Sequence, residues 1–222
     1  KDTGVKGIYN FTAEPDTITT NKTSVISFDL KGFPAGISSL DSLNVEVLES
    51  INLITNILNK VNVSDGKYFA YWNGHDVNEN IVQDGRYTIR IIGNDKGSLF
   101  QSTKTITFDR TPPLVIDTKS DNQVITSYYT GREWSKDAVN INAYLQDNLR
   151  NNLDHFDYSV YNLNNILVLN KTTSMNISDN QRVFFTWNAV DNNNIKVNDG
   201  TYFILITAYD KAGNASLPSI IT

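Results

Sequence analysis

Three oxygen-bearing side chains, Asp76, Asn78 and Asn80, stand at alternate positions shortly after a tryptophan. Carboxylate and amide oxygens at this spacing can converge on a hard cation, as they do in Ca²⁺-binding loops. The rest of that ligand pattern is missing, because Ile81 occupies the position that requires glycine and Tyr87 the position that requires a bidentate glutamate. We therefore predict a turn in which Asx side chains bind the backbone, keep Ca²⁺ binding as the alternative, and assign no metal ligand.

Two histidines, His75 and His155, are the candidates for acid–base catalysis. Val190 replaces His75 in a second copy of its loop, and His155 stands at the edge of an expected strand. The sequence contains no Gly-x-Ser-x-Gly, His-Glu-x-x-His or P-loop motif. It also contains no cysteine, which excludes a thiolate nucleophile and a cysteine-bound zinc ion. We predict no catalytic residue and no cofactor, and we expect both histidines at the surface.

A segment rich in aromatic residues, 127–137, is the candidate for binding a partner. Its candidate binding residues are Tyr128, Tyr129, Arg132 and Trp134. Aromatic and arginine side chains on loops supply much of the binding energy of protein interfaces. The structural alternative, which we favour, is a flap over one open end of its domain or a contact with the preceding domain.

The loop that carries Asp76 belongs to a passage that occurs twice, as residues 72–96 and 187–211. At an offset of 115 positions, 12 of these 25 residues are identical, so the chain contains an internal repeat. Before each loop, residues 67–72 and 182–187 alternate in the way that predicts a half-buried β-strand. Large aromatic side chains on the apolar face of such a strand belong to the core. The side chains assigned to the core on this basis are Trp72, Tyr87, Trp187 and Tyr202.

Similar short alternating runs continue along both halves of the chain. They predict strands over 7–11, 24–30, 43–49, 51–58, 87–91 and 103–109, and over 113–117, 138–145, 156–163, 165–170, 202–206 and 217–222. Residues 37–58 leave a helix open as the alternative. About seven strands per half predict an all-β chain of two tandem immunoglobulin/fibronectin type III-like β-sandwiches. We place these domains at 1–111 and 112–222, with Pro112 and Pro113 at the boundary.

The composition of the chain limits the classes of partner that it could bind. The net charge is −5 and no basic stripe is present, which argues against nucleic acid and against anionic lipid. No run of 18 apolar residues exists, so we expect no insertion into a membrane. The first residues do not resemble a signal peptide and the only methionine is Met175, so we expect this chain to be a piece of a longer polypeptide.

The repeated passage resembles a known pattern, Trp-Asx-Gly-x-Asp-x-Asn-Gly-x-x-Val-x-Asp-Gly-x-Tyr. That pattern occurs in the fibronectin type III-like domains of bacterial cell-envelope subtilisin-like proteases, the lactocepin and complement-peptidase group, and in the immunoglobulin-like domain of flagellar hook-capping proteins. The stretch "FDRTPP" at 108–113 resembles the junction between such domains. The chain departs from the pattern where Glu79 and Asn194 replace one glycine and Ala189 replaces another.

The resemblance implies a non-catalytic part of a large secreted bacterial protein, outside the cell at its surface or wall. In the proteases, these modules are spacers or surfaces that face the substrate. We therefore expect a monomeric tandem module whose partners are other domains of its own polypeptide and a protein substrate or surface ligand. The alternative is a repeat of a surface adhesin or a surface-layer structural protein, and a flagellar cap is a third class.

Overall fold

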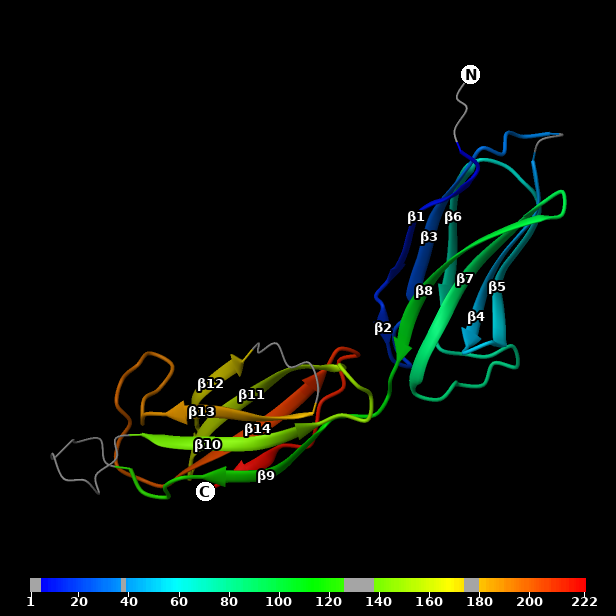
Figure 1. The fold of residues 1–222 in the computed structure, drawn as a ribbon. Coiled ribbons are helices and arrows are strands. Elements are labelled where there is room, and N and C mark those ends of the chain that lie inside the picture. Colours follow the sequence, from blue (N-terminus) through cyan, green and yellow to red (C-terminus); the bar gives the residue numbers. More distant parts are fainter. Residues whose placement is uncertain (1–4, 37–38, 126–137, 174–179) are drawn as a thin grey trace. The chain divides into compact units, whose positions relative to one another are not determined.

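The computed structural model describes residues 5–36, 39–125, 138–173 and 180–222 (Figure 1). The chain divides into two units, Lys1–Arg110 and Thr111–Thr222. All regular elements in the described residues are β-strands, which confirms the predicted all-β class. Within these ranges, no helix has the length and apolar character that crossing a membrane requires.

Unit 1 is a sandwich of two sheets. Its strands are β1 (Gly7–Glu14), β2 (Thr17–Ile18), β3 (Ser24–Lys31), β4 (Leu40–Glu49), β5 (Asn52–Val63), β6 (Gly66–Trp72), β7 (Gly85–Asp95) and β8 (Ser98–Phe108). One sheet has the order β1-β3-β6 and the other the order β2-β8-β7-β4-β5. All neighbours are antiparallel except the short strand β2, which runs parallel to β8. A cluster of buried apolar side chains fills the space between the sheets.

Unit 2 repeats this plan with its own core. Its strands are β9 (Leu114–Ser120), β10 (Val139–Gln146), β11 (Leu153–Asn162), β12 (Leu167–Thr173), β13 (Gln181–Trp187), β14 (Tyr202–Asp210) and β15 (Ser219–Ile221). The sheets have the orders β13-β10-β9 and β12-β11-β14-β15. Each unit therefore combines a three-stranded sheet with a larger one, which is the predicted immunoglobulin/fibronectin type III-like sandwich.

The helix that the sequence left open over 37–58 does not form, and β4 and β5 occupy this stretch instead. Leu43, Val45 and Val47 are fully buried, and the residues between them lie on the opposite face of the sheet. β5 extends to Val63, five residues beyond the prediction. The extension was missed because three of its five residues, Asn59, Lys60 and Asn62, are polar, and its pairing with β4 runs through the backbone.

The two repeated tryptophans lie in the cores, as predicted. Trp72 is 1% exposed and Trp187 is 5% exposed. Each indole packs against the repeated tyrosine, with ring centroids 5.0 Å apart for Trp72–Tyr87 and 5.2 Å apart for Trp187–Tyr202. Tyr87 is buried as predicted, whereas Tyr202 is only half-buried.

The strands around Tyr202 explain this difference. In unit 1, β7 begins at Gly85, which pairs with Phe108 at the end of β8. In unit 2, the counterpart of Gly85 is Gly200, but β14 begins only at Tyr202. The reason is that β15 pairs with β14 from Ile204 onward and leaves the residues before Ile204 without this neighbour. The last strand was predicted over 217–222 but comprises only Ser219–Ile221.

Tyrosine hydroxyls hold strands to the turns that precede them. In four cases the hydroxyl donates to the carbonyl four residues earlier: Tyr9 to Val5, Tyr68 to Ser64, Tyr87 to Gln83 and Tyr202 to Asn198. The ring of Tyr87 is buried, and a buried phenol must satisfy its hydroxyl, which this local bond does at the entrance of β7. Burial, assisted by the negative charges of Glu49 and Asp84, raises the pKa of Tyr87 to about 12.

We predict that Tyr87 makes unit 1 sensitive to alkali. As the pH rises, the unfolded chain loses this proton near pH 10 and the folded chain near pH 12, so the stability present below pH 10 is lost between these values. The slope for one such group is at most about 1.4 kcal/mol per pH unit. Denaturant unfolding at pH 9 to 11.5 should show a weaker pH dependence for Tyr87→Phe than for the wild type. The control is Tyr71→Phe, at an exposed position; equal slopes for the two variants would contradict the prediction.

Candidate functional site

The predicted binding residues Tyr128, Tyr129, Arg132 and Trp134 lie outside the described residues. The remaining places that could do chemistry are the repeated loops, the histidines, a pair of buried carboxylates and a cavity in unit 2.

The first repeated loop is built around two side chains. The indole nitrogen of Trp72 donates to the carbonyl of His75 at 3.0 Å, which fixes the loop to the core. Oδ1 of Asp76 accepts the backbone N–H groups of Asn78 and Asn80, both at 2.8 Å. The backbone N–H groups of Asn80 and Asn78 stabilise the charged carboxylate, and the side-chain amide of Asn80 does so too. Together these bonds lower the pKa of the Asp76 carboxyl. The Asx turn predicted here is therefore formed, and the carboxylate accepts hydrogen bonds from the backbone of its own loop.

The second repeated loop has the same construction. The indole nitrogen of Trp187 donates to the carbonyl of Val190 at 3.0 Å. Oδ1 of Asp191 accepts the N–H groups of Asn193 and Ile195, at 2.8 and 2.9 Å. Val190 thus supplies the backbone carbonyl that His75 supplies in unit 1, so neither loop depends on an imidazole at this position.

Four positions in these loops have a left-handed backbone. The φ angles are 83° at Gly74, 54° at Ala189, 63° at Glu79 and 61° at Asn194. These are the positions at which the family pattern has glycine, and glycine adopts such angles without steric cost. The departures from the pattern therefore keep its backbone and place a side chain where the geometry favours none.

His155 contacts a carboxylate and an aromatic ring, and His75 lines a groove. His155 Nδ1 lies 2.8 Å from Asp154 Oδ2, and its ring stacks on Tyr209 at 4.5 Å between centroids. No sequence motif indicated that a carboxylate holds His155, and the structure supplies one from Asp154, its neighbour in the chain. His75 lines a polar groove of about 420 Å³ in unit 1, together with Asp76 and Glu79.

Two buried carboxylates in unit 2, Asp147 and Asp210, have side-chain oxygens within 4.8 Å of each other. Paired carboxylates can hold a divalent cation. Both also bind the backbone: Asp147 accepts the N–H of Leu149 at 2.7 Å, and Asp210 accepts those of Gly213 and Asn214 at 2.7 and 2.8 Å. The sequence analysis missed this pair because it comes from turns 63 residues apart, each of which reads as an ordinary turn signal.

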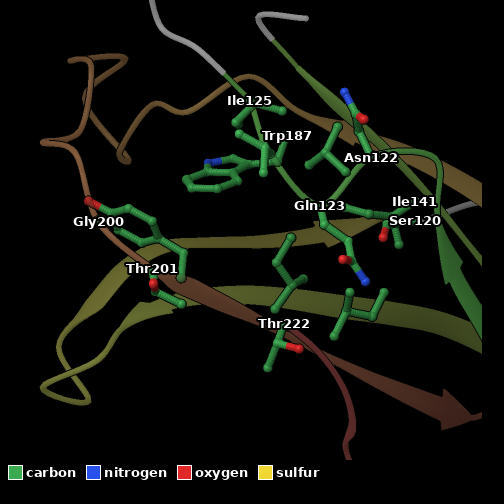
Figure 2. A pocket seen from close by; sticks show the side chains of 14 residues that line it. Ser120, Asn122, Gln123, Ile125, Ile141, Trp187, Gly200, Thr201 and Thr222 are labelled. Carbon is green, nitrogen blue, oxygen red and sulfur yellow. The ribbon is translucent and has the colours of Figure 1, made fainter.

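The cavity in unit 2 has a volume of about 260 Å³ (Figure 2). Trp187 and Ile125 lie together on one side of it, and Thr222 lies across from them. Gly200 and Thr201, just before β14, form part of its wall. None of the described lining residues is acidic, basic or a histidine. Such a cavity favours uncharged groups, because its wall combines apolar side chains with the neutral polar side chains of Asn122, Gln123 and Thr201.

A second, smaller cavity of about 210 Å³ adjoins the first, and both are lined by Ile125, Trp187, Gly200 and Tyr202. Its own wall includes Ala189 and Val197 of the second repeated loop. No sequence signal indicated either cavity, because the residues that line them show the ordinary alternation of core strands.

No protein-family model matches this sequence, and no curated protein is significantly similar to it. Among solved structures, the fibronectin(III)-like modules of Clostridium thermocellum CbhA are 16% identical over 95% of this chain and 90% of theirs, with a TM-score of 0.41. Dimeric latent PorU from Porphyromonas gingivalis is 12% identical over 99% of this chain and 20% of its own, with a TM-score of 0.35. The Yersinia pseudotuberculosis adhesin InvE is 14% identical over 96% and 58%, with a TM-score of 0.30. Similarities this distant carry no argument about function.

We predict that Glu79→Gly stabilises unit 1. A non-glycine residue in the left-handed region costs about 1–2 kcal/mol, and glycine removes this cost at a φ of 63°. Thermal unfolding should show a higher midpoint for Glu79→Gly. Asn194→Gly is the matched variant in unit 2 and should gain less, because asparagine tolerates this conformation. An equal or larger gain for Asn194→Gly would contradict the assignment of strain to Glu79.

Proposed function

We propose that this chain is a non-catalytic tandem module of a large secreted bacterial cell-surface protein. The observation that carries the proposal is that the side chains shared by the two repeats serve to hold the fold together. Trp72 and Tyr87 pack in the core and Asp76 binds the loop backbone. In unit 2, Trp187 and Asp191 do the same, and the half-buried Tyr202 packs against Trp187. The repeat thus preserves what a sandwich needs to fold, which is typical of a scaffold rather than of a reaction centre.

The parent we propose first is a subtilisin-like serine protease of the cell envelope. The resemblance of the repeated passage supports it, and the module would hold the catalytic domain away from the wall or present substrate. The chain would act as a monomer outside the cell, with the other domains of its polypeptide as its constant partners. Autonomous β-sandwiches suit this role, because each has its own core and tolerates neighbours on either side.

A repeat of an adhesin or a surface-layer protein is the second proposal, and the outer face of one sheet favours it. Phe69 and Tyr71 on β6 are 48% and 60% exposed, and Val25 on β3 pairs with Tyr71. The charge of Lys67 lies over the ring of Phe69 at 5.6 Å. Exposed aromatic residues beside a cation are typical of protein recognition surfaces.

The parent protein distinguishes the first proposal from the second. An antibody raised against this chain would capture the native polypeptide from the cell envelope, which would then react with a fluorophosphonate probe for active serine hydrolases. We expect a labelled polypeptide much larger than the 24.9 kDa of this chain. A large polypeptide without label would contradict the protease proposal and favour the adhesive or structural one. A captured polypeptide no larger than this chain would contradict both.

The adhesive proposal makes its own prediction for a captured parent that carries no label. Tyr71→Ala, or Trp134→Ala in the segment proposed for binding, should weaken attachment to the surface ligand at least 5-fold without lowering the thermal midpoint, since an exposed aromatic contributes little to folding. Tyr87→Ala is the control for lost folding, because that ring is buried. If Trp134→Ala lowers the midpoint and leaves attachment unchanged, residues 127–137 have the structural role.

A further inference from the structure

The polar groove of unit 1 lies where the edges of its two sheets meet the first repeated loop. β5 is the edge strand of the larger sheet and β6 is the edge strand of the smaller one. Thr55 and Asn56 of β5 line the groove together with Tyr71 of β6, and the loop adds His75 and Glu79. Its volume of about 420 Å³ is within the range of small-molecule sites.

Tyr71, His75 and Glu79 are groove side chains that the second repeat replaces. At the offset of 115 positions, their counterparts are Thr186, Val190 and Asn194. The second loop nevertheless forms the same indole and Asx bonds as the first. Nδ1 of His75 is also buried without a hydrogen-bond partner among the described residues. The fold therefore does not require these three side chains, and they are available to a ligand.

The backbone of β5 provides a donor beside the groove. In unit 2, Oδ1 of Asn192 in the loop accepts the N–H of Asn170 on the edge strand β12 at 3.0 Å. The loop is anchored alike in both units, since the N–H groups of Val77 and Asn192 each donate to the edge strand at 3.2 Å. This anchor makes Asn56 the counterpart of Asn170. Valine has no side-chain acceptor, so the loop of unit 1 leaves the N–H of Asn56 uncovered at the groove.

The lining selects an uncharged ligand that is rich in hydroxyl groups. Asp76 and Glu79 are acidic, and no lysine or arginine lines the groove, so an anion would be repelled. A cation would suit Glu79 but has no acceptor for the N–H of Asn56. Hydroxyl groups both donate and accept, so they can serve Glu79, Asn56 and the hydroxyl of Thr55 together. Tyr71 is 60% exposed and offers a flat apolar face for the C–H groups of a sugar ring.

We propose that the groove of unit 1 binds an uncharged saccharide, with one sugar ring against Tyr71 and its hydroxyl groups bonded to β5 and to the loop. Glu79 accepts hydrogen bonds from these hydroxyls. The left-handed φ of 63° at Glu79 thus places a carboxylate at the groove in a position where the fold favours glycine. The inference goes beyond the proposed function, because the groove lies within unit 1 and serves a protease or an adhesin alike.

The experiment titrates the whole chain with maltohexaose, mannohexaose and chitohexaose, with the matching monosaccharides, and with polygalacturonate as the acidic probe. Heteronuclear NMR spectra report the indole N–H of Trp72 at the groove and that of its counterpart Trp187 in the same sample. We expect at least one neutral hexamer to shift the Trp72 signal saturably below about 10 mM and to leave the Trp187 signal in place. Tighter binding of the hexamer than of its monosaccharide identifies a polymer as the source, and equal binding identifies a free sugar.

Single substitutions separate the groove from the sheet face beside it. Tyr71→Ala should weaken binding about 5-fold or more, whereas Phe69→Ala removes an exposed ring of the same strand outside the groove and should leave binding unchanged. Glu79→Gly should weaken binding although it stabilises the fold. Val77→Asn should weaken binding too, since the new side chain would accept the N–H of Asn56 as the loop of unit 2 does for its own edge strand.

A triple variant guards against loss of binding through unfolding. Tyr71→Thr, His75→Val and Glu79→Asn together copy the residues with which unit 2 folds, so this variant should keep the thermal midpoint and lose the saccharide.

Three results would overturn the proposal. The first is that no neutral hexamer shifts the Trp72 signal up to about 10 mM. The second is that polygalacturonate binds as tightly as the neutral hexamers, since the groove would then not select against charge. The third is that Phe69→Ala weakens binding as much as Tyr71→Ala, because the sheet face would then be the binding surface. None of these results depends on whether the captured parent reacts with the fluorophosphonate probe.

Discussion

Both sandwiches depend on an indole that is buried while its one polar atom remains bonded. The ring fills the core beside the repeated tyrosine, and its N–H group reaches the backbone of the following loop at 3.0 Å in each unit. A buried donor without a partner would cost about 1–3 kcal/mol, so the loop must pass where its carbonyl can accept this bond. The Asx turn, the left-handed residues and the entry into the next strand all follow from that path. This constraint explains why the repeat is most similar over this passage and diverges elsewhere.

The sequence predicted the fold well where side chains alternate and poorly where the backbone alone decides. The strands ending in Trp72 and Trp187 combine apolar alternation with a turn signal, and both were placed correctly. β2 was missed because two residues carry no periodicity, and the end of β5 was missed because three of its last five residues are polar. Burial of Tyr202 was overestimated because it depends on a neighbouring strand, and the sequence of β14 resembles that of β7 whether or not the neighbour is present.

Among the candidate sites, the local contacts were predicted and most of the others were not. The Asx turn was predicted because its bonds are local, joining Asp76 to residues two and four positions later. The pair formed by Asp147 and Asp210 escaped prediction, since a sequence does not show which side chains meet between turns. Asp154 stands next to His155 in the sequence, but adjacency alone does not show that the two side chains bond. The cavity had no signal at all, because it reflects which strand residues are adjacent in space rather than what they are.

The parallel pairing of β2 with β8 has a mechanical consequence. In unit 1, Thr17 and Ile18 lie beside Thr107 and Phe108, so a strand near the start of the unit is bonded to the strand at its end. Tension applied to the two ends of this unit loads those bonds in shear, all at once, whereas a hairpin opened from one end loses its bonds one by one. A pull along the chain therefore meets its resistance in unit 1 at the bonds between β2 and β8.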